Sequence, residues 1–240
     1  MSEKAQTETT ENAAITQREA EALDVLRGAL AKHGDAIALA SSFSLEDVVL
    51  LDLLSRLRSG VRVFAIDTGR LPEETLLCAD TAADRFGLRI EWYFPQHAAV
   101  EKLLREKGAY SFRESLENRH ECCRIRKVEP LSRALTGLTG WITGLRREQN
   151  ISRTRLETAE ADMLHGGIMK YNPLAAWTAA DVRAYAKARR LPFNRLYAEG
   201  YRSIGCAPCT RAVQSGEDER AGRWWWENPE HKECGLHARH

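Results

Sequence analysis

Residues 61–69 read Val-Arg-Val-Phe-Ala-Ile-Asp-Thr-Gly, a β-branched apolar run that ends abruptly in a polar turn. Residues 37–44 repeat this design, because Ile-Ala-Leu-Ala is followed directly by Ser-Ser-Phe-Ser. A helical pattern follows each run, at 45–57 and at 72–86. Short, nearly continuous apolar strands that alternate with helices are typical of a parallel sheet covered on both faces. The sequence therefore predicts an α/β fold with a doubly wound, mainly parallel sheet.

The same alternation continues on both sides of this stretch. It predicts further helices at 15–32, 97–107, 122–135 and 179–189, and further strands at 88–94 and 140–144. We expect residues 1–14 to be a disordered leader and residues 15–192 to form a nucleotide-binding α/β domain. Residues 193–240 are rich in Gly, Pro, Tyr and Trp and poor in periodicity. We expect them to be an irregular C-terminal segment of the same domain.

The composition excludes several classes of protein. The 240 residues include 35 Lys+Arg and 34 Asp+Glu, a net charge of +1, which does not favour a general nucleic-acid binder. No apolar run approaches the roughly 18 residues that a membrane span needs. Residues 1–12 are polar and acidic, unlike a signal peptide. We therefore expect a cytoplasmic protein without a membrane segment.

Six cysteines are the least ordinary feature of the composition. They form an adjacent pair, a Cys-x-x-Cys pair, one residue near the C-terminus and one solitary residue: Cys122, Cys123, Cys206, Cys209, Cys234 and Cys78. In a reducing cytoplasm they are not expected to form a disulfide framework. Two pairs separated by about 80 residues indicate instead a metal site with four thiolate ligands.

Soft thiolate ligands are typical of zinc, copper and iron–sulfur sites. Structural zinc sites usually use pairs spaced by two to four residues, and adjacent cysteines strain a tetrahedral arrangement around one ion. An iron–sulfur cubane has separate iron atoms, and four cysteines are the expected ligands of one [4Fe–4S] cluster. We therefore favour one [4Fe–4S] cluster and assign the solitary Cys78 to the core.

Polar turns follow three of the predicted strands, where parallel α/β sheets bind ligands. They are Ser-Ser-Phe-Ser at 41–44, Asp-Thr-Gly at 67–69 and Gly-Leu-Arg-Arg at 144–147. The first turn precedes a helix, whose amide groups and dipole attract anions, but it has no Walker A glycines or lysine. Each turn alone is more typical of ordinary capping. Together they favour an adenine-nucleotide pocket.

The C-terminal tail holds a candidate nucleophile. Cys234 lies between Lys232 and His237, and nearby positive charge lowers the pKa of a thiol and makes it reactive. Arg220 and Arg223 are three residues apart, a spacing that would place them on one helical face to hold a sulfate or phosphate. The tail alone does not distinguish this role from that of an idle thiol.

Taken together, these motifs resemble the assimilatory phosphosulfate reductases, which reduce adenylyl sulfate (APS) or 3′-phosphoadenylyl sulfate (PAPS). The resemblance covers nearly the whole chain. It rests on Ser-Ser-Phe-Ser-Leu-Glu-Asp at 41–47, Asp-Thr-Gly-Arg-Leu at 67–71, Gly-Leu-Arg-Arg-Glu-Gln at 144–149 and Lys-Glu-Cys-Gly-Leu-His at 232–237. PAPS-specific members typically keep the tail cysteine but lack both cysteine pairs. This sequence is therefore similar to the iron–sulfur type that reduces APS.

The resemblance implies an adenine nucleotide α-hydrolase-like fold and a role for each motif. The cluster ligands would be Cys122, Cys123, Cys206 and Cys209. The phosphosulfate would be contacted by Lys127, Arg220, Arg223 and His237. The adenosine and phosphate pocket would be lined by Ser41, Ile66, Thr68, Gly144 and Arg153. Cys234 would attack the sulfur of APS and release AMP, and thioredoxin would then reduce the enzyme S-sulfocysteine to free sulfite. Members of such families often form homo-oligomers.

Three other functions remain open at this point. The same reaction on PAPS is the nearest. An ATP-dependent adenylyltransferase or sulfur-insertion enzyme of the same superfamily would need a glycine-containing pyrophosphate loop, and residues 41–47 contain no glycine. A zinc-stabilised nucleic-acid-binding module is disfavoured by the net charge and by the lack of a basic stripe.

Overall fold

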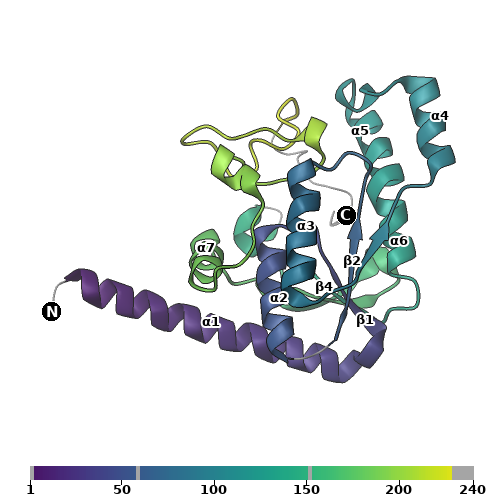
Figure 1. The fold of residues 1–240 in the computed structure, drawn as a ribbon. Helices are drawn as coiled ribbons and strands as arrows, with labels where there is room; N and C mark the ends of the chain where they lie inside the picture. Colours follow the sequence, from purple (N-terminus) through teal and green to yellow (C-terminus); the bar gives the residue numbers. More distant parts are fainter. Residues whose placement is uncertain (1–2, 58–59, 151–152, 229–240) are drawn as a thin grey trace. The chain divides into compact units, whose positions relative to one another are not determined.

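The computed structural model describes residues 3–57, 60–150 and 153–228. Its strands form one six-stranded sheet in the order β3-β2-β1-β4-β6-β5 (Figure 1). The pairs β1–β4, β4–β6 and β2–β3 are parallel, whereas β5 runs antiparallel to β6. Helices connect the strands, as the apolar runs and their helical neighbours predict. The expected α/β fold with a mainly parallel sheet is confirmed.

The chain divides into two compact units. Unit 1 comprises residues 1–40, 45–62 and 138–192, and unit 2 comprises residues 41–44, 63–137 and 193–240. The start of the expected C-terminal segment at Phe193 coincides with the return of the chain to unit 2. Each unit is described by itself below.

Unit 1 contains four strands and three long helices. The strands are β1 (Ile37–Ala40), β4 (Gly140–Ile142), β5 (Ala159–Asp162) and β6 (Ile168–Tyr171). The helices are α1 (Glu3–His33), α2 (Leu45–Leu57) and α7 (Ala179–Ala188). Because α2 is apolar on nearly every face, it is buried along most of its length and packs against both α1 and α7.

Polar side chains in unit 1 join these three helices. The hydroxyl of Tyr185 on α7 donates to Asp52 on α2 at 2.7 Å. Arg56 on α2 contacts both Tyr185 and Glu19 on α1. The side chain of Thr178 caps α7, since it accepts from the backbone of the first turn.

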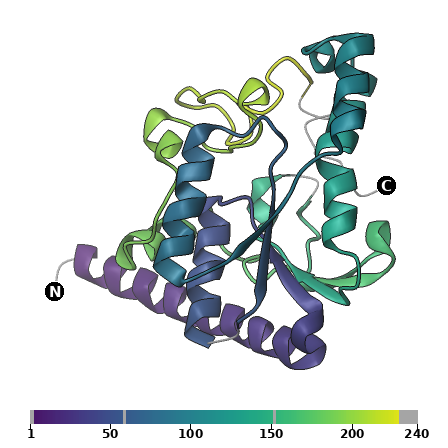
Figure 2. The ribbon, with the colours of Figure 1, turned by 45° about the vertical axis from the view of Figure 1, so that its right-hand side comes forward.

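Unit 2 is built on the parallel pair β2 (Arg62–Ile66) and β3 (Ile90–Tyr93). Its helices are α3 (Glu73–Phe86), α4 (His97–Lys107), α5 (Leu116–Cys123) and α6 (Glu129–Ala134). Figure 1 shows α4 beside α5, where Lys107 donates to Asn118 and Glu121. Residues 193–228 contain short 3₁₀ turns at Arg195–Glu199 and Ala207–Cys209 and an isolated antiparallel bridge between Thr210 and Arg223 (Figure 2).

Three predictions about helices and strands need correction. Helix α1 begins at Glu3, within the stretch expected to be a disordered leader, because residues 3–14 contain helix-favouring Glu, Ala and Gln and no Gly or Pro. The predicted helix at 122–135 is two helices separated by a π-helical turn at Arg124–Val128. Strand β5 was not predicted, since Ala-Glu-Ala-Asp is a poor strand sequence that pairs only at a sheet edge.

None of the described helices has both the length and the apolar character that crossing a membrane requires.

Candidate functional site

The turn at 41–44 is held firmly at the end of β2 in unit 2. The amide of Ser41 donates to the carbonyl of Phe64 at 2.9 Å, and the Ser41 hydroxyl accepts from the amide of Phe43 at 3.1 Å. Phe43 has a φ of +55°, which is unfavourable for a bulky residue, and its ring is buried next to Trp92. Packing therefore holds the turn in a conformation that its sequence alone would not favour.

The turn after β2 leads toward the cysteines. Ile66 ends the strand half-buried, and Thr68 is 2% exposed. The Thr68 hydroxyl lies 3.3 Å from the sulfur of Cys206, and its carbonyl accepts from Arg126 at 2.7 Å. Thr68, which the resemblance assigns to the adenosine pocket, thus contacts one predicted cluster ligand, Cys206, directly.

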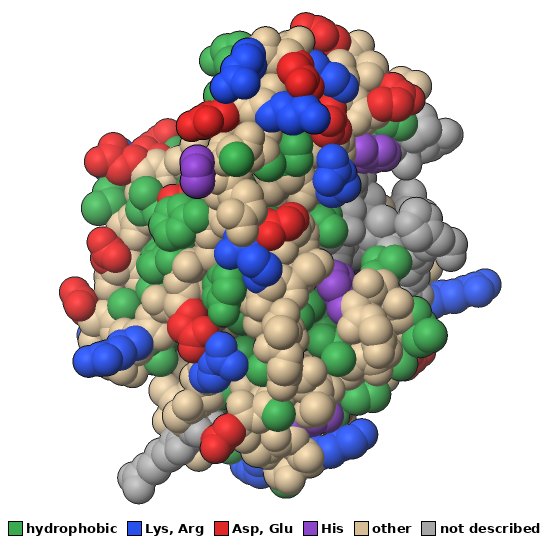
Figure 3. Space-filling model, turned by 90° about the vertical axis from the view of Figure 1, so that its right-hand side faces the viewer, with side chains coloured by type: hydrophobic (Ala, Val, Ile, Leu, Met, Phe, Trp, Pro, Cys, Tyr) green, Lys and Arg blue, Asp and Glu red, His purple; other side chains and the backbone are tan. Residues whose placement is uncertain are grey.

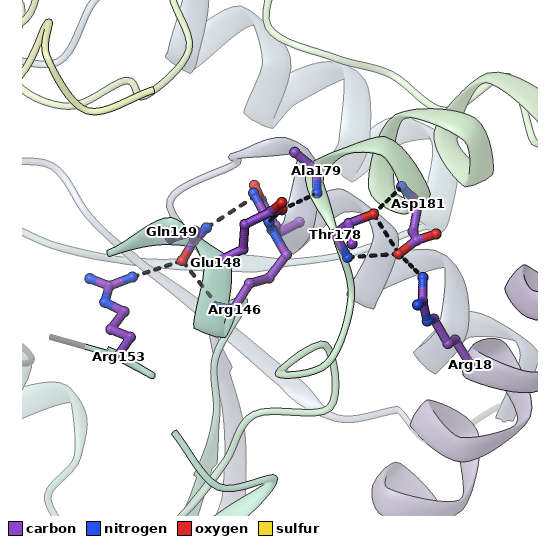
Figure 4. A network of polar contacts seen from close by, with 9 residues as sticks. Arg18, Arg146, Glu148, Gln149, Arg153, Thr178, Ala179 and Asp181 are labelled. Atoms are coloured by element: carbon purple, nitrogen blue, oxygen red, sulfur yellow. Dashed lines mark hydrogen bonds and ion pairs between the residues drawn. The ribbon is translucent and has the colours of Figure 1, made fainter. Parts of the chain in front are cut away.

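A buried network follows β4 in unit 1 (Figure 4). One carboxylate oxygen of Glu46 accepts from the Nε of Arg146 at 2.9 Å and from Gln149 at 3.1 Å. Arg146 also donates to Glu148 at 3.0 Å, and Glu148 in turn accepts from the amide of Ala179 at the start of α7. These contacts fix the loop after β4 between the first turn of α2, which carries Glu46, and the first turn of α7, which begins at Ala179.

Gly144 and Arg153 both belong to this part of unit 1. A Cβ on Gly144 would lie 2.4 Å from a carboxylate oxygen of Asp47, so only glycine fits there. Arg153 is 8% exposed and donates to the side-chain oxygen of Gln149 at 2.7 Å. The five residues expected around adenosine therefore fall into two groups, with Gly144 and Arg153 in unit 1 and Ser41, Ile66 and Thr68 in unit 2.

A cavity in unit 2 is lined by both cysteine pairs. The sequence spacing predicts that the pairs meet, and the fold brings all four side chains to one place. The lining residues are Arg70, Phe112, Arg119, Cys122, Cys123, Arg126, Lys127, Cys206, Cys209 and Trp224. Four of these ten side chains are thiols and four are cations, a combination suited to an anionic metal–thiolate centre.

The first pair is positioned by the end of α5. Ser115 caps this helix by accepting from the amide of Asn118 at 3.2 Å, so the pair lies in the last turn of α5 and does not open a helix as expected. The π-helical turn that follows buries Arg126, while Arg124 stays exposed. Such turns are frequent at functional sites, because they redirect side chains that a regular helix would keep on another face.

The second pair lies in the tight turn that the sequence predicts. The amide of Cys209 donates to the carbonyl of Cys206 at 2.9 Å, and Thr210 donates through its hydroxyl to the same carbonyl. The amide of Ala207 donates to the carbonyl of Arg70 at 2.8 Å, which ties the turn to the end of β2. Arg113 donates to the carbonyl of Pro208 at 3.1 Å. The turn is therefore held from both sides.

Burial favours the neutral thiol form of Cys122 and of Cys209. Burial raises the pKa of Cys122, against the opposing charges of Arg126 and Arg70. Burial, followed by the charge of Cys206, raises the pKa of Cys209 to about 12, although Lys127 and Arg223 act in the opposite direction. Thiols of this kind become thiolates when a metal centre replaces their protons.

The donor set supplies four thiols at one cavity, which suits a metal–thiolate centre. All cysteines in the described residues are free thiols, and two pairs line one cavity. Among the described residues, no three Cys, His, Asp or Glu side chains are arranged to hold a metal ion. Ligands of a cluster need not converge on one point, because each thiolate binds a different iron atom. Cys78 is 4% exposed and lies apart, so its assignment to the core is confirmed.

Three of the predicted phosphosulfate contacts belong to unit 2. Lys127 is half-buried and lines the cavity. Arg223 is 6% exposed and donates to the carbonyl of Ile204 at 3.2 Å, and Arg220 is half-buried in a turn rather than on a helix. The expectation that these two arginines share a helical face is therefore wrong. Cys234 and His237 lie outside the described residues.

Several cavity residues were missed by the sequence analysis. Arg126 was given no role, although its place after the cysteine pair could have identified it. Arg70 and Arg119 had no such signal, because their approach to the cysteines depends on the turn after β2 and on the face of α5. Trp224 lies between two guanidinium groups, 4.8 Å from that of Arg119 and 4.7 Å from that of Arg223.

The sequence profile of the phosphoadenosine phosphosulfate reductase domain matches residues 36–212. The chain belongs to this family. The matched region contains both cysteine pairs and all six described strands. A curated relative, the adenosine 5′-phosphosulfate reductase of Allochromatium vinosum, is 47% identical over 94% of this chain and 87% of its own.

Solved structures support the same family and fold. The phosphoadenylyl-sulfate (PAPS) reductase of Candida auris has a TM-score of 0.68 and 28% identity, over 80% of this chain and 90% of its own. The FMN adenylyltransferase of Candida glabrata has a TM-score of 0.61 and 14% identity, over 92% of this chain and 75% of its own. The second likeness concerns the fold alone and agrees with the expected adenine nucleotide α-hydrolase-like architecture.

The surface shows no large area of one charge on the face drawn in Figure 3, where Lys and Arg side chains are interspersed with Asp and Glu. The described part of that face therefore offers no basic stripe for a nucleic acid.

Proposed function

We propose that this protein reduces adenosine 5′-phosphosulfate to sulfite and AMP, with thioredoxin as the electron donor. The observation that carries the proposal is the cavity of unit 2, in which two cysteine pairs meet four cationic side chains. Family membership supports the class of reaction. The Allochromatium relative is named for APS, and its match extends over nearly all of both chains. The reaction would supply sulfite for the assimilation of sulfate toward cysteine.

The four cavity cysteines are proposed to hold one [4Fe–4S] cluster. The chemistry of the donor set supports it, because Cys122, Cys123 and Cys206 are buried, Cys209 is half-buried, and all four thiols line one cavity. When bound, the cluster would supply a fixed negative charge that orders the surrounding cations, without accepting or donating electrons in the reaction. The buried guanidinium of Arg126 has no hydrogen-bond partner at its Nε, as expected of a donor that faces an anionic group.

The first chemical step is proposed to take place at Cys234. Its thiolate attacks the sulfur of APS, a sulfur–sulfur bond forms, and the bond from that sulfur to the phosphate oxygen breaks. AMP leaves with the electron pair of the broken bond, and the enzyme carries an S-sulfocysteine. Attack of an anion on an anion needs compensating positive charge in the transition state. Lys127, Arg220, Arg223 and His237 are proposed to provide it.

The second step regenerates the thiol and requires two electrons. A thioredoxin thiolate attacks the Cys234 sulfur, and sulfite leaves as the sulfur–sulfur bond breaks. The second thioredoxin thiol then attacks the mixed disulfide, which frees Cys234 and leaves thioredoxin oxidised. Both thiols of thioredoxin are consumed, which balances the reduction of sulfur from the sulfate to the sulfite level. We propose the cytoplasm as the compartment, because thioredoxin and reduced cysteines coexist there.

The adenosine part of APS is proposed to bind at the strand ends of unit 2, near Ser41, Ile66 and Thr68. The roles that the resemblance implies for Gly144 and Arg153 in unit 1 stay predictions. The same reaction on PAPS is the second candidate, since the Candida auris structure is a PAPS reductase. The two cysteine pairs and the APS-named relative favour APS. Competition between APS and PAPS in one assay distinguishes the two substrates, with the higher kcat/KM expected for APS.

Intact-mass spectrometry tests the proposed intermediate. Purified protein mixed with APS and no reductant should gain the mass of one SO₃, and peptide mapping should place it on Cys234. A Cys234→Ser variant should bind AMP and show no adduct, whereas Cys78→Ser should form the adduct normally. An adduct on any other cysteine would contradict the proposed role of Cys234.

A further inference from the structure

A buried ion pair in unit 2 joins one of the cavity cations, Arg119, to Glu227 in the C-terminal segment. The side chain of Arg119 has no exposed surface, and that of Glu227 is 9% exposed. The Nε of Arg119 donates to one carboxylate oxygen of Glu227 and a terminal nitrogen donates to the other, each at 3.0 Å. Two parallel hydrogen bonds fix the orientation of the partners as well as their separation.

The arginine end of the pair belongs to the cysteine site. Arg119 precedes Cys122 and Cys123 on α5 by three and four residues, a spacing that places all three on neighbouring positions of one helix face. Its guanidinium lies 4.8 Å from the ring centre of Trp224, which packs against Cys123. Arg119 also lines the cavity itself.

The glutamate end belongs to the last described stretch of the chain. The amide of Glu227 donates to the carbonyl of Trp224 at 2.8 Å, and the amide of Trp224 donates to the carbonyl of Cys209 at 3.1 Å. A Cβ on Gly222 would lie 2.2 Å from the carbonyl oxygen of Arg211, so the two backbones are in direct contact. The stretch 222–227 is thus laid closely along 209–211. Cys234 follows Glu227 by seven residues.

Stability alone does not account for this arrangement. Removing two charges from water offsets most of their attraction, and apolar side chains of similar volume often stabilise a protein equally well. Unlike apolar packing, the two parallel hydrogen bonds of the pair fix one position of Glu227 relative to α5.

We infer that Arg119 and Glu227 are positioning residues that fix the point from which the chain leads to Cys234. The inference rests on the proposed function, because it needs Cys234 as the nucleophile. Seven residues span at most about 25 Å when fully extended. A displaced starting point therefore changes how often the thiol reaches the sulfur of bound APS.

The test is a double-mutant cycle on the single-turnover rate of S-sulfocysteine formation. Arg119→Met and Glu227→Leu are made singly and together, and adduct formation is followed by intact mass. Each single variant should slow the transfer by about 100-fold, the effect of misplacing a reacting group by about 1 Å. The double variant should be no slower than the slower single one, because the two residues act as a unit.

Two controls separate position from other effects. Glu217→Gln breaks a bidentate but more exposed pair with Arg211 in the same C-terminal segment, and it should leave the rate within about twofold. The alkylation of Cys234 by iodoacetamide should proceed at the wild-type rate in all variants, since this reaction needs no particular position of the thiol. A parallel fall of alkylation and sulfo transfer would contradict a positioning role.

The double variant keeps the inference testable if the single ones fail to fold, because it leaves no buried charge without a partner. A folded double variant that forms the adduct at the wild-type rate would overturn the inference alone. A wild-type protein that forms no adduct on Cys234 would overturn the proposed function and this inference with it.

Discussion

The arginines of the two units have different partners. In unit 1, Arg146 donates to the carboxylates of Glu46 and Glu148, so its charge is neutralised within the protein. In unit 2, Arg126, which lines the cysteine cavity, and Arg223 donate to main-chain carbonyls instead. A carbonyl holds a guanidinium in place without cancelling its charge.

This difference separates a structural role from a functional one. The paired arginine of unit 1 fixes a loop, and its carboxylate partners offset its charge. In unit 2, the cavity residue Arg119 is paired with Glu227 in the same way. Arg70 and Arg126, which also line the cavity, donate to main-chain carbonyls, so their positive charge remains for a ligand, which the proposed function identifies as an anionic cluster and an anionic phosphosulfate. A net charge of +1 conceals this distribution. The predictions below test the contrast from its strongest consequence to its weakest.

Loss of a proposed cluster ligand should have the largest effect. Cys209→Ser should abolish bound iron and lower activity by more than about 100-fold, the loss that substitutions around a metal site reach even without touching a ligand. The Cys78→Ala variant should keep its bound iron and its activity, and its unfolding free energy should decrease by about 1 kcal/mol. Iron analysis and a sulfite-release assay measure the two results. Retention of iron in Cys209→Ser would remove this residue from the ligand set.

Loss of a cavity cation should affect catalysis more than binding. Lys127→Ala should lower kcat by about 10²- to 10³-fold, because the developing negative charge loses a preorganised partner. The Kd of AMP should change by only a few-fold, since AMP lacks the transferred sulfonate. Arg124 lies on the exposed side of the same turn, so Arg124→Ala is the matched control and should change neither kcat nor the Kd of AMP. Equal losses in kcat and AMP binding would argue against a transition-state role.

Loss of a paired charge in unit 1 should affect stability instead. Glu46→Gln leaves Arg146 buried without its first carboxylate, so the unfolding free energy in urea should fall by about 3 kcal/mol. Asp24→Asn, which breaks an exposed pair with Arg27, should cost under about 0.5 kcal/mol. Iron content should stay unchanged in both variants. A stable Glu46→Gln protein would show that the network of Figure 4 is not what holds the loop after β4.

The smallest expected effect concerns the contact between α2 and α7. Burial and the Asp52 carboxylate raise the pKa of Tyr185, so its hydroxyl stays protonated and donates at neutral pH. Tyr185→Phe should lower the unfolding free energy by about 1 to 2 kcal/mol, because Asp52 loses a buried donor. Tyr110→Phe, at an exposed hydroxyl-bearing side chain, should have no effect in the same urea titration. Equal stability of the two variants would contradict this account of the contact.

Local patterns in the sequence were sufficient to predict most of the fold. The apolar runs at 37–40 and 62–66 are strands, and Thr178 caps its helix as expected. These features depend on neighbours in the sequence. The end of α5 and the π-helical turn after it were not predictable in this way, because the turn forms where packing redirects Arg126 toward Thr68.

In the candidate site, too, local sequence patterns predict some features, whereas others depend on contacts between residues far apart in the sequence. Adjacent and Cys-x-x-Cys pairs indicate a shared metal centre, and the fold brings both pairs to one cavity. The contact of Thr68 with Cys206 and the pairing of Arg119 with Glu227 join residues more than a hundred positions apart. No local pattern encodes such contacts, so the residues that position the cysteines had to come from the structure.

Iron and acid-labile sulfide content of anaerobically purified protein tests the central claim most directly. The claim is that the two cysteine pairs form one site for an iron–sulfur cluster, beside cations that hold an anionic substrate. The account predicts about four irons and four sulfides per chain. A protein with one zinc ion and no sulfide, active or not, would contradict it.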